Sequence, residues 1–548
     1  MNPDHPQPPE AAGAPSGALS PMRHAAFRSM WIVWLVANVG MWMNDVTSAW
    51  LMTSLTDSAA MVALVQTALT LPVFLLGLPS GAIADMLDRR RYAMATQLWV
   101  GAVGTFTAAA LLYGLMTPVL LLALSFANGI GLAMRWPVFA AIVPQLVPRA
   151  ELPAALALNS IAMNASRIVG PLVAGAAIGA LGIGAVFALN AGLSVAMVFV
   201  VYRWPSTRTV QRLPRERLLT AIRAGAQHVR QSLPMRRVLL RIFIFFFHST
   251  ALVSLLPVLA RRFPGSDAGT FTFMLASLGV GAIAAGVLLP RLRRRLDTDQ
   301  VLFWGGLLHA LATCAAGLAP DVRWALPALL LSGMAWISVA NGVTLAAQVA
   351  LPDWVRARGM SIYMMAIMGS SALGAATWGH VAGWTDLRSA LALSAASALL
   401  VLLASRRVRI GDGLDRDLSI AQDLQPPDDC QIADGARGPV LVIIEYQIEV
   451  DGAEAFLAVM EETRRARLSQ GALSWALYAD AAVPGRYIEQ VRDASWLEHL
   501  RRYERMTVAD MDLRQRRMGF HIGPEAPRIS FCIAAPTRRR STSPALGD

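Results

Sequence analysis

The sequence predicts an α-helical protein that crosses a membrane twelve times and ends in a small α+β domain. Hydrophobic residues make up 55% of the 548-residue chain and charged residues only 15%, whereas soluble domains carry about 25% charged residues. Long apolar stretches between Met30 and Ser405 reach the roughly 20 residues that a helix needs to cross a hydrocarbon core. Beyond Arg409 the composition becomes polar. We therefore expect a polytopic membrane part followed by a water-exposed C-terminal part.

The expected spans form two bundles of six helices. The first bundle, residues 27–204, contains the spans 30–52, 60–82, 93–114, 118–143, 155–180 and 183–204. The second bundle, residues 238–405, contains the spans 238–260, 268–290, 300–319, 324–350, 360–382 and 387–405. Residues 205–237 form the longest connection, a cytoplasmic central loop. Its amphipathic pattern from Glu216 to Val229 predicts a helix that lies at a membrane surface.

The distribution of arginine predicts the orientation. All 48 basic residues are Arg, and the net charge is +12. Most of them lie in connections on one side of the expected spans, whereas the other side holds only Arg261, Arg262, Arg323 and Arg388. Because basic residues accumulate in short cytoplasmic loops, we expect a bacterial inner-membrane protein with both termini in the cytoplasm. This topology accounts for the charge, so no nucleic-acid partner is expected.

The segments outside the bundles predict two tails, a linker and one domain. Residues 1–26 are rich in Pro, Ala and Gly and are expected to form a disordered cytoplasmic tail, residues 406–437 a flexible linker, and residues 536–548 a second tail. Residues 438–535 predict strands at 440–448, 473–479, 486–492 and 528–534, with helices at 451–468 and 495–517. The order βαββαβ is that of a ferredoxin-like module. Capping patterns, Asp451 with Glu454 and Ser495 with Glu498, mark the expected helix starts.

The sequence predicts no metal site and no cofactor. Cys314, Cys430 and Cys532 lie far apart, whereas zinc sites and disulfide frameworks show paired spacings. No phosphate-binding loop motif is present, which argues against an ATP-driven engine within this chain. Three histidines in or near the spans are expected to have structural roles: His248, His309 and His380.

A motif of small and charged residues connects the second and third spans. It consists of Gly77, Gly81, Asp85, Arg89 and Arg90. Glycines allow close contact between helices, and Asp85 can pair with an arginine at the cytoplasmic surface and so hold one conformation shut. We expect these residues to form a cytoplasmic gate. The alternative is that the charges only set the membrane orientation.

This motif resembles the loop signature of the major facilitator superfamily, Gly-x-x-x-Asp-x-x-x-Arg-Arg. The stretch Gly81–Ala84 recurs in the second bundle as Gly281–Ala284, which indicates two related bundles. The second copy has Ala285 where the first has Asp85, so the gate is expected to be asymmetric. The resemblance implies the major facilitator fold.

The fifth span contains residues that favour bending and close packing. Gly170, Pro171 and Gly175 lie within little more than one helical turn. Proline removes a backbone donor and glycine removes side-chain bulk, so the helix can bend and pack tightly there. The pattern resembles the fifth-helix signature of antiporters in the superfamily, which implies export more than uptake.

Five polar residues inside the spans are candidates for substrate binding or proton coupling: Asp45, Arg135, Arg167, Asn44 and Asn164. A charged side chain inside a membrane costs roughly 2.5–3.5 kcal/mol on insertion scales, so such residues usually mark a pathway or a buried pair. Because a low-dielectric environment favours the neutral form of a carboxyl group, Asp45 is expected to carry the coupling proton. In the alternative interpretation, the arginines reach lipid phosphates and Asp45 is hydrated near the outer mouth.

A longer resemblance covers nearly the whole chain. The motifs Asn164-x-x-Arg167-x-x-Gly-Pro171 and Ser495-Trp-x-Glu-His-Leu500 are similar to those of the transmembrane secretion effector branch, which is enterobactin-exporter-like. The resemblance implies a lipid-embedded secondary transporter that exports a small organic compound, such as a drug, siderophore or secondary metabolite. Competing interpretations are a membrane-tethered enzyme and a sensor that binds a ligand without moving it.

The C-terminal part resembles the antibiotic biosynthesis monooxygenase fold, a ferredoxin-like module that commonly forms a dimeric barrel. The resemblance implies a cytoplasmic module that forms a homodimer or regulates transport, and a fold alone does not establish enzyme activity. An oxygenase would have to use the polar and aromatic residues of this module: His499, Tyr446, Tyr478, Trp475 and Arg486. We expect a transporter and not an enzyme.

Overall fold

The computed structural model describes residues 19–86, 88–143, 146–148, 151–203, 218–265, 267–292, 295–411, 417–419, 421 and 438–534. The chain forms two compact units. The helical unit comprises Met1–Leu213, Leu240–Val343 and Tyr363–Val408. The mixed unit comprises Pro214–Leu239, Thr344–Ile362 and Arg409–Asp548. Residues 1–18 of the expected N-terminal tail, the expected C-terminal tail, the central loop before Leu218 and most of the linker lie outside the described residues. The expectation of a disordered tail is wrong for residues 20–26, which form a 3-10 turn and the start of the first long helix.

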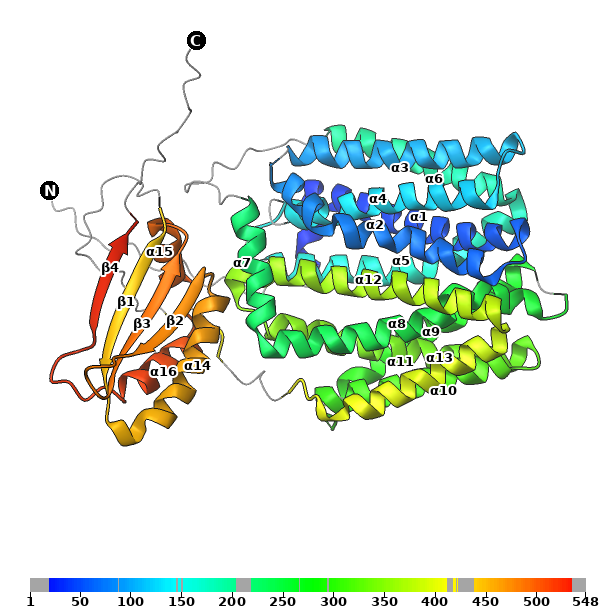
Figure 1. The fold of residues 1–548 in the computed structure, drawn as a ribbon. Helices are drawn as coiled ribbons and strands as arrows, with labels where there is room; N and C mark the ends of the chain where they lie inside the picture. Colours follow the sequence, from blue (N-terminus) through cyan, green and yellow to red (C-terminus); the bar gives the residue numbers. More distant parts are fainter. Residues whose placement is uncertain are drawn as a thin grey trace, which may run out of the picture. The chain divides into compact units, whose positions relative to one another are not determined.

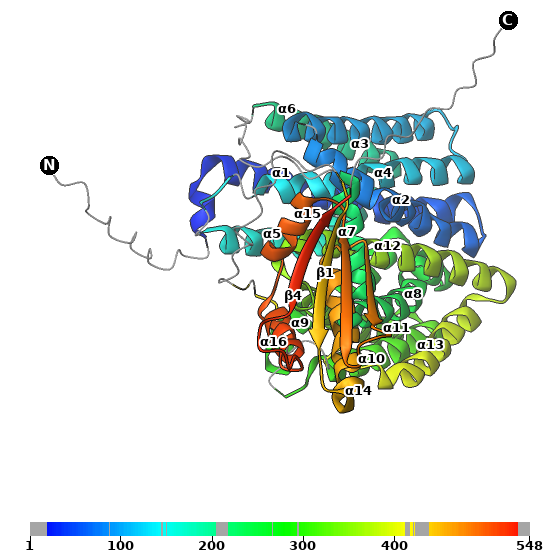
Figure 2. The same cartoon turned by 60° about the vertical axis from the view of Figure 1, so that its left-hand side comes forward.

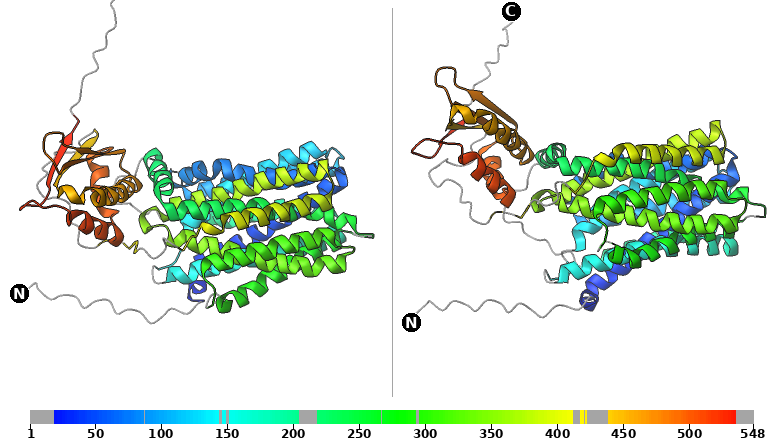
Figure 3. Two further views of the ribbon diagram at one scale, coloured as in Figure 1. Left: turned by 60° about the horizontal axis from the view of Figure 1, so that its bottom comes forward. Right: turned by 90° about the horizontal axis from the view of Figure 1, so that it is seen from below.

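Two sets of long helices agree with the expected spans (Figure 1). The first set is α1 (Ala25–Leu55), α2 (Ala59–Met86), α3 (Arg89–Leu112), α4 (Pro118–Ile142), α5 (Leu152–Leu181) and α6 (Ile183–Arg203). The second set is α8 (Leu233–Arg262), α9 (Ala268–Leu292), α10 (Thr298–Leu318), α11 (Val322–Val349), α12 (Asp353–Trp384) and α13 (Leu387–Ala404). Short 3-10 turns precede α1 (Ser20–Arg23) and follow α13 (Ser405–Arg407). The long helices run side by side within the helical unit (Figure 3).

Eleven helices in the described part of the chain are long and apolar enough to cross a membrane. The helix α1 is not among them, although it contains 31 residues. Its apolar sequence is interrupted by Asn38, Asn44, Asp45 and Thr47, which lower the mean hydropathy. The structure therefore establishes a polytopic helical protein, and the count of twelve spans stays a prediction.

The two sets of helices share a buried apolar cluster near the end of the bundle where α1 ends. Trp50 of α1 stacks on Phe271 of α9, with 5.4 Å between ring centroids. Ala174 of α5 and Leu256 of α8 belong to the same cluster. Apolar packing therefore joins the two sets at this end of the helical unit.

The mixed unit contains a four-stranded antiparallel sheet (Figure 2). Its elements are β1 (Val440–Gln447), α14 (Ala453–Ser469), β2 (Ser474–Ala479), β3 (Arg486–Asp493), α15 (Trp496–Glu504), α16 (Val508–Met518) and β4 (Arg528–Ile533). The strand order is β2-β3-β1-β4, with every neighbouring pair antiparallel. This small sheet agrees with the expected ferredoxin-like domain.

Buried and partly exposed residues alternate along the central strand β1, and the buried ones contribute to the core of this domain. Val440, Val442, Ile444 and Tyr446 are buried, and the residues between them are partly exposed. The buried face packs against Phe456 of α14 and neighbouring residues. A period of two is what a strand with one covered face requires.

Two predicted details of this domain are wrong. The expected helix 495–517 is two helices, because Thr507 starts a new helix with a capping box to Asp510. Asp451 does not cap α14, since it lies in the 3-10 turn Val450–Gly452 and α14 begins after Gly452 without a side-chain cap. The other expected cap is present, because the Ser495 side chain accepts a hydrogen bond from the Glu498 backbone nitrogen at 3.2 Å.

The amphipathic helix expected in the central loop is α7 (Leu218–Gln231). Its buried side lies against α14 within the mixed unit. Gln227 Nε2 donates to the Ala472 carbonyl at 2.6 Å, and His228 Nδ1 lies 3.2 Å from the Ser469 carbonyl. The exposed residues Arg223 and Arg230 lie on the other side. The amphipathic sequence pattern thus identified the helix α7 correctly. Contacts of Gln227 and His228 with the C-terminal domain account for part of its buried face.

A buried carboxylate, Glu489 of β3, organises the polar interior of the C-terminal domain. Its side chain accepts hydrogen bonds from the Tyr446 hydroxyl at 2.8 Å, the Trp475 indole at 3.0 Å and Arg467 Nε at 3.2 Å. Burial by itself raises the pKa of the Glu489 carboxyl, but Arg467, Arg517 and these hydrogen bonds outweigh burial and lower its net pKa. The carboxylate is therefore held in its charged form.

We expect Glu489→Ala to destabilise the C-terminal domain by about 3–5 kcal/mol, because it leaves a buried guanidinium without its carboxylate. The measurement is hydrogen exchange of the β1 and β3 amides in the purified protein. A carboxylate with a lowered pKa stabilises the fold fully above its unfolded pKa of about 4.3, and this stabilisation is lost as the pH falls through the lower folded value. The difference between wild type and variant should therefore shrink in acid.

The matched control is Glu445→Ala on the opposite face of the same sheet. Glu445 pairs with Arg486 at 2.6 Å, where the two side chains are 27% and 37% exposed. Exposed ion pairs contribute about 0–1 kcal/mol, so this variant should exchange nearly as slowly as wild type. Equal effects of the two substitutions would contradict the role assigned to Glu489.

Candidate functional site

Arg135 of α4 is held against α1 in the interior of the first helix set. Its side chain is buried, and Nη1 donates to the Ala37 carbonyl at 3.0 Å. Nη2 lies 3.0 Å from the Met41 sulfur, and the guanidinium lies 5.9 Å from the centre of the Trp34 ring. The predicted candidate Arg135 is therefore fixed by protein groups, which argues against the alternative that it reaches lipid phosphate.

Asp45 is the acidic partner of this arginine. It lies on α1 beyond Met41, and it interacts electrostatically with Arg135. Its Oδ1 atom is buried and has no hydrogen-bond partner among the described residues. Asn44 beside it is also buried. The structure thus brings together two of the predicted charged candidates, Asp45 and Arg135, on neighbouring helices.

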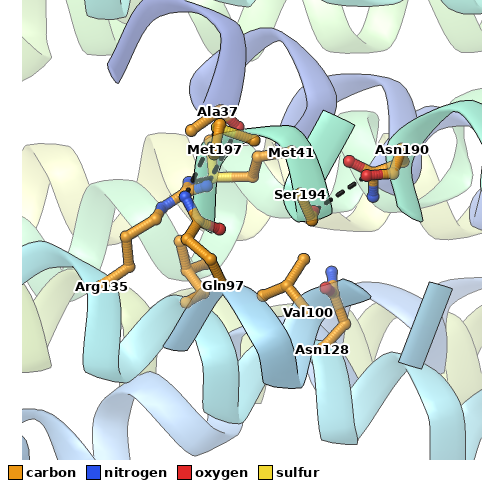
Figure 4. A pocket seen from close by; sticks show the side chains of 10 residues that line it. Ala37, Met41, Gln97, Val100, Asn128, Arg135, Asn190, Ser194 and Met197 are labelled. Carbon is orange, nitrogen blue, oxygen red and sulfur yellow. Dashed lines mark hydrogen bonds between the residues drawn. The ribbon is translucent and has the colours of Figure 1, made fainter. Parts of the chain in front are cut away.

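A small polar cavity adjoins Arg135 (Figure 4). Its volume is about 10 Å³, close to the lower limit for holding one water molecule. Four polar side chains line it together with Arg135: Gln97, Asn128, Asn190 and Ser194. Sequence reasoning missed these four, although amide and hydroxyl groups within apolar helices were a signal that could have found them.

Arg167 lies at a different place, where the two helix sets meet. Its guanidinium carbon is 3.7 Å from the centre of the Trp336 ring on α11 and 5.4 Å from that of Trp42 on α1. Trp336 itself makes an edge contact with Phe246 of α8 at 5.6 Å. Arg167 is thus in contact with both sets, and it is not part of the Asp45 and Arg135 cluster.

The glycines predicted to allow close packing of α5 do so on two sides. A Cβ atom on Gly170 would meet Trp42 and the Val39 carbonyl of α1. A Cβ atom on Gly175 would collide with Thr272 of α9. Pro171 lies inside α5, and the helix continues through it. The helix α5 therefore packs tightly against one helix of each set.

The expected cytoplasmic gate is described only in part. A Cβ atom on Gly77 would lie 3.2 Å from Met365 of α12, so α2 and α12 approach closely there. The Arg90 guanidinium lies 4.9 Å from the centre of the Tyr202 ring and donates to the Tyr202 carbonyl of α6. The side chains of Gly81, Asp85, Arg89 and Asn164 lie outside what the structure describes. The pairing of Asp85 with an arginine stays a prediction.

The three histidines of the spans each form a hydrogen bond with another protein group, within the same helix for His248 and His380 and between α10 and α11 for His309. The Nδ1 atoms of His248 and His380 each lie 2.7 Å from a carbonyl one turn earlier, and His309 Nδ1 lies 3.0 Å from the Ser332 hydroxyl. His248 and His309 also line a cavity of about 40 Å³ in the second helix set. In the described part of the chain, no group of three or more His, Cys, Asp or Glu residues could hold a metal ion.

The residues singled out in the C-terminal domain do not converge on one site. Tyr446 and Trp475 both bind the buried Glu489. His499 is buried elsewhere, with Nδ1 at 2.7 Å from Asp493 Oδ2. The remaining two residues are at the surface: Arg486 pairs with Glu445 and Asp480, and Tyr478 is exposed. Four of the five side chains are engaged by acidic side chains of the domain itself, and this arrangement favours a structural role.

Comparisons with known proteins match most of the chain. Residues 16–540 fit the family model described as transmembrane secretion effector. The uncharacterised transporter YfiS of Bacillus subtilis (strain 168), of the major facilitator type, is 26% identical over 353 residues, 62% of this chain and 82% of that protein. The staphyloferrin A transporter of Staphylococcus aureus (strain NCTC 8325 / PS 47) is 22% identical over 278 residues, 50% of this chain and 69% of that protein.

A solved structure shows the same helical fold. It is that of a bacterial homologue of the human lysosomal transporter Spinster in an inward-facing, unoccupied conformation. The TM-score is 0.55 at 14% identity, over 71% of this chain and 96% of the other.

We expect Gly175→Ala to lower the thermal stability of the purified protein. The added methyl group collides with Thr272, and overpacking of this kind costs about 1–3 kcal/mol. The control is Gly179→Ala on the same helix, where a Cβ atom meets nothing within 4 Å. Unfolding midpoints in detergent check both variants, and equal midpoints would contradict the tight contact between α5 and α9.

Proposed function

We propose that the chain, which belongs to the transmembrane secretion effector family of the major facilitator superfamily, exports a small organic compound in exchange for protons. Its family makes it a secondary membrane transporter, embedded in the bacterial inner membrane by many spans. Two related helix sets rock about a central site in alternating access. In this proposal the termini lie in the cytoplasm, and Gly77, Gly81, Asp85, Arg89 and Arg90 form the cytoplasmic gate.

The observation that carries proton coupling is the electrostatic interaction between Asp45 and Arg135 inside the first helix set. Their charges interact where burial leaves Asp45 Oδ1 without a hydrogen bond from any described residue. A charged Asp45 compensates the positive charge of the buried Arg135 guanidinium, and protonation of Asp45 removes that compensation. Protonation therefore shifts the equilibrium between two arrangements of α1 and α4. Proton binding at one side of the membrane can thus favour one conformation. Asn44 and Asn164 are proposed to support this site from α1 and α5.

Two observations support export of an organic compound. The sequence from Gly170 to Gly175 resembles the fifth-helix signature of antiporters, and Gly170 and Gly175 allow tight packing of α5 against α1 and α9. The relative from Staphylococcus aureus carries the name of a siderophore transporter, and siderophores are small organic compounds. We propose a substrate of this general class, which includes secondary metabolites and drugs.

We propose that the C-terminal domain regulates transport and has no enzymatic activity. The Arg505 guanidinium lies 4.9 Å from the centre of the Trp354 ring, and Trp354 also contacts His228 of α7 at 5.5 Å. The domain therefore contacts α7, which connects the two helix sets in the sequence, and the start of α12. The other sheet face bears partly exposed Leu441 and Ile443, and we propose that it pairs with a second copy of the chain.

We expect Asp45→Asn to insert normally and to reduce gradient-driven export by about tenfold or more, within the usual range of coupling free energies. The amide cannot carry the coupling proton. Uptake into everted vesicles under an imposed pH gradient provides the measurement. Asp57→Asn, at an exposed position after the end of α1, should export like wild type. Full gradient-dependent export by Asp45→Asn would remove Asp45 from the mechanism.

Deleting residues 438–548 should leave transport of a chemically unchanged compound. The reason is that the coupling groups and both helix sets remain in the shortened chain. Mass spectrometry of the exported compound, together with native mass spectrometry of the protein, checks the chemistry and the loss of dimers. A compound that is modified only by the full-length chain would instead favour the membrane-tethered enzyme.

A further inference from the structure

Arg167 occupies the middle of the helical unit and lies between two tryptophans. It is about halfway along the 30-residue helix α5. Trp336 and Trp42 lie near the middle of α11 and α1. One ring belongs to each helix set, and both are in contact with the same guanidinium. The positive charge is thus placed near the membrane midplane, at the interface between the sets.

The described residues leave this charge without an anionic partner. Arg167 forms no ion pair with any carboxylate that the structure describes, and the electrostatic partner of Arg135 is Asp45. Contact with an aromatic ring attracts a cation, but this attraction is smaller than the penalty for taking the charge out of water. A half-buried guanidinium near the membrane midplane, between two aromatic rings, therefore favours an anion.

A second donor lies beside it. Trp42 Nε1 is buried and has no hydrogen-bond acceptor in the part of the chain that the structure describes. A buried donor without an acceptor is costly. An anion with two oxygen atoms could accept from the guanidinium, whose planar fork matches a carboxylate, and from the neighbouring indole.

We propose that Arg167 and Trp42 bind a carboxylate of the transported compound, which makes the substrate an organic acid. This inference rests on the proposed transport function. The depth of the site favours a soluble acid over a lipid phosphate, because the midplane lies about 15 Å from either surface of a hydrocarbon core of about 30 Å. Lipid headgroups stay at those surfaces.

The location also links binding to conformational change. Arg167 lies on α5 in the first helix set, and its shortest aromatic contact is with Trp336 in the second. A carboxylate that binds the guanidinium competes with this contact. Substrate binding therefore weakens one interaction between the sets, which is the differential interaction that alternating access requires.

The test compares organic acids with neutral analogues on the full-length protein in detergent, without a gradient. The probes are 2-naphthoate, adipate and tricarballylate, each paired with its amide, and binding is followed by tryptophan fluorescence and thermal stabilisation. We expect at least one acid to bind wild type about tenfold or more tightly than its amide, as a charge-assisted pair would. Arg167→Gln should abolish this preference, and Arg167→Lys should retain part of it. Arg291→Gln, at an exposed position, should bind like wild type.

Several outcomes would overturn the proposal. They are the absence of acid preference in wild type for every pair, an unchanged preference in Arg167→Gln, and stabilisation by added phosphatidylglycerol alone. If Arg167→Gln does not fold, Trp42→Phe keeps an aromatic ring and removes the indole donor, so it should weaken acid binding severalfold, and unchanged acid binding in this variant would overturn the role of Trp42. Because binding is measured without a gradient, its failure is distinguishable from failure of proton-driven export.

Discussion

Charge compensation in a low-dielectric interior is the constraint on which the arrangement of the helical unit depends. Arg135 is buried and anchored to carbonyl and sulfur atoms of α1, so the positions of α1 and α4 are tied to one guanidinium. Asp45 supplies the opposite charge from the same helix α1. Each group is costly to bury alone, and a change in the protonation of one alters the surroundings of the other. The proposed coupling therefore depends on the same two residues as the packing of α1 against α4.

The sequence predicted the elements of this protein better than their partners. Hydropathy and arginine placement identified the helices, and alternation of apolar residues identified the strands of the C-terminal domain. The pairing of Arg167 with Trp336 could not be predicted, because the two residues belong to different helix sets and no local pattern links them. The polar lining of the Arg135 cavity was missed for the same reason: Gln97 and Asn190 line one cavity only after α3 and α6 have packed.

The two errors in the C-terminal domain have local causes. The pattern from Ser495 to Arg517 is helical throughout, so the break depends on the capping geometry of Thr507 and Asp510. Asp451 is followed by an acid at the correct spacing, but the backbone makes a 3-10 turn first. In both places the sequence pattern is compatible with a cap or a turn, and only the backbone geometry distinguishes the two.

The apolar cluster around Trp50 and Phe271 has a consequence for the working temperature of the transporter. Attraction between apolar side chains is weakly sensitive to ionic strength, but it diminishes on cooling. Packing between the two helix sets at that end of the helical unit should therefore loosen in the cold, and their separation there should become easier at low temperature than at high salt.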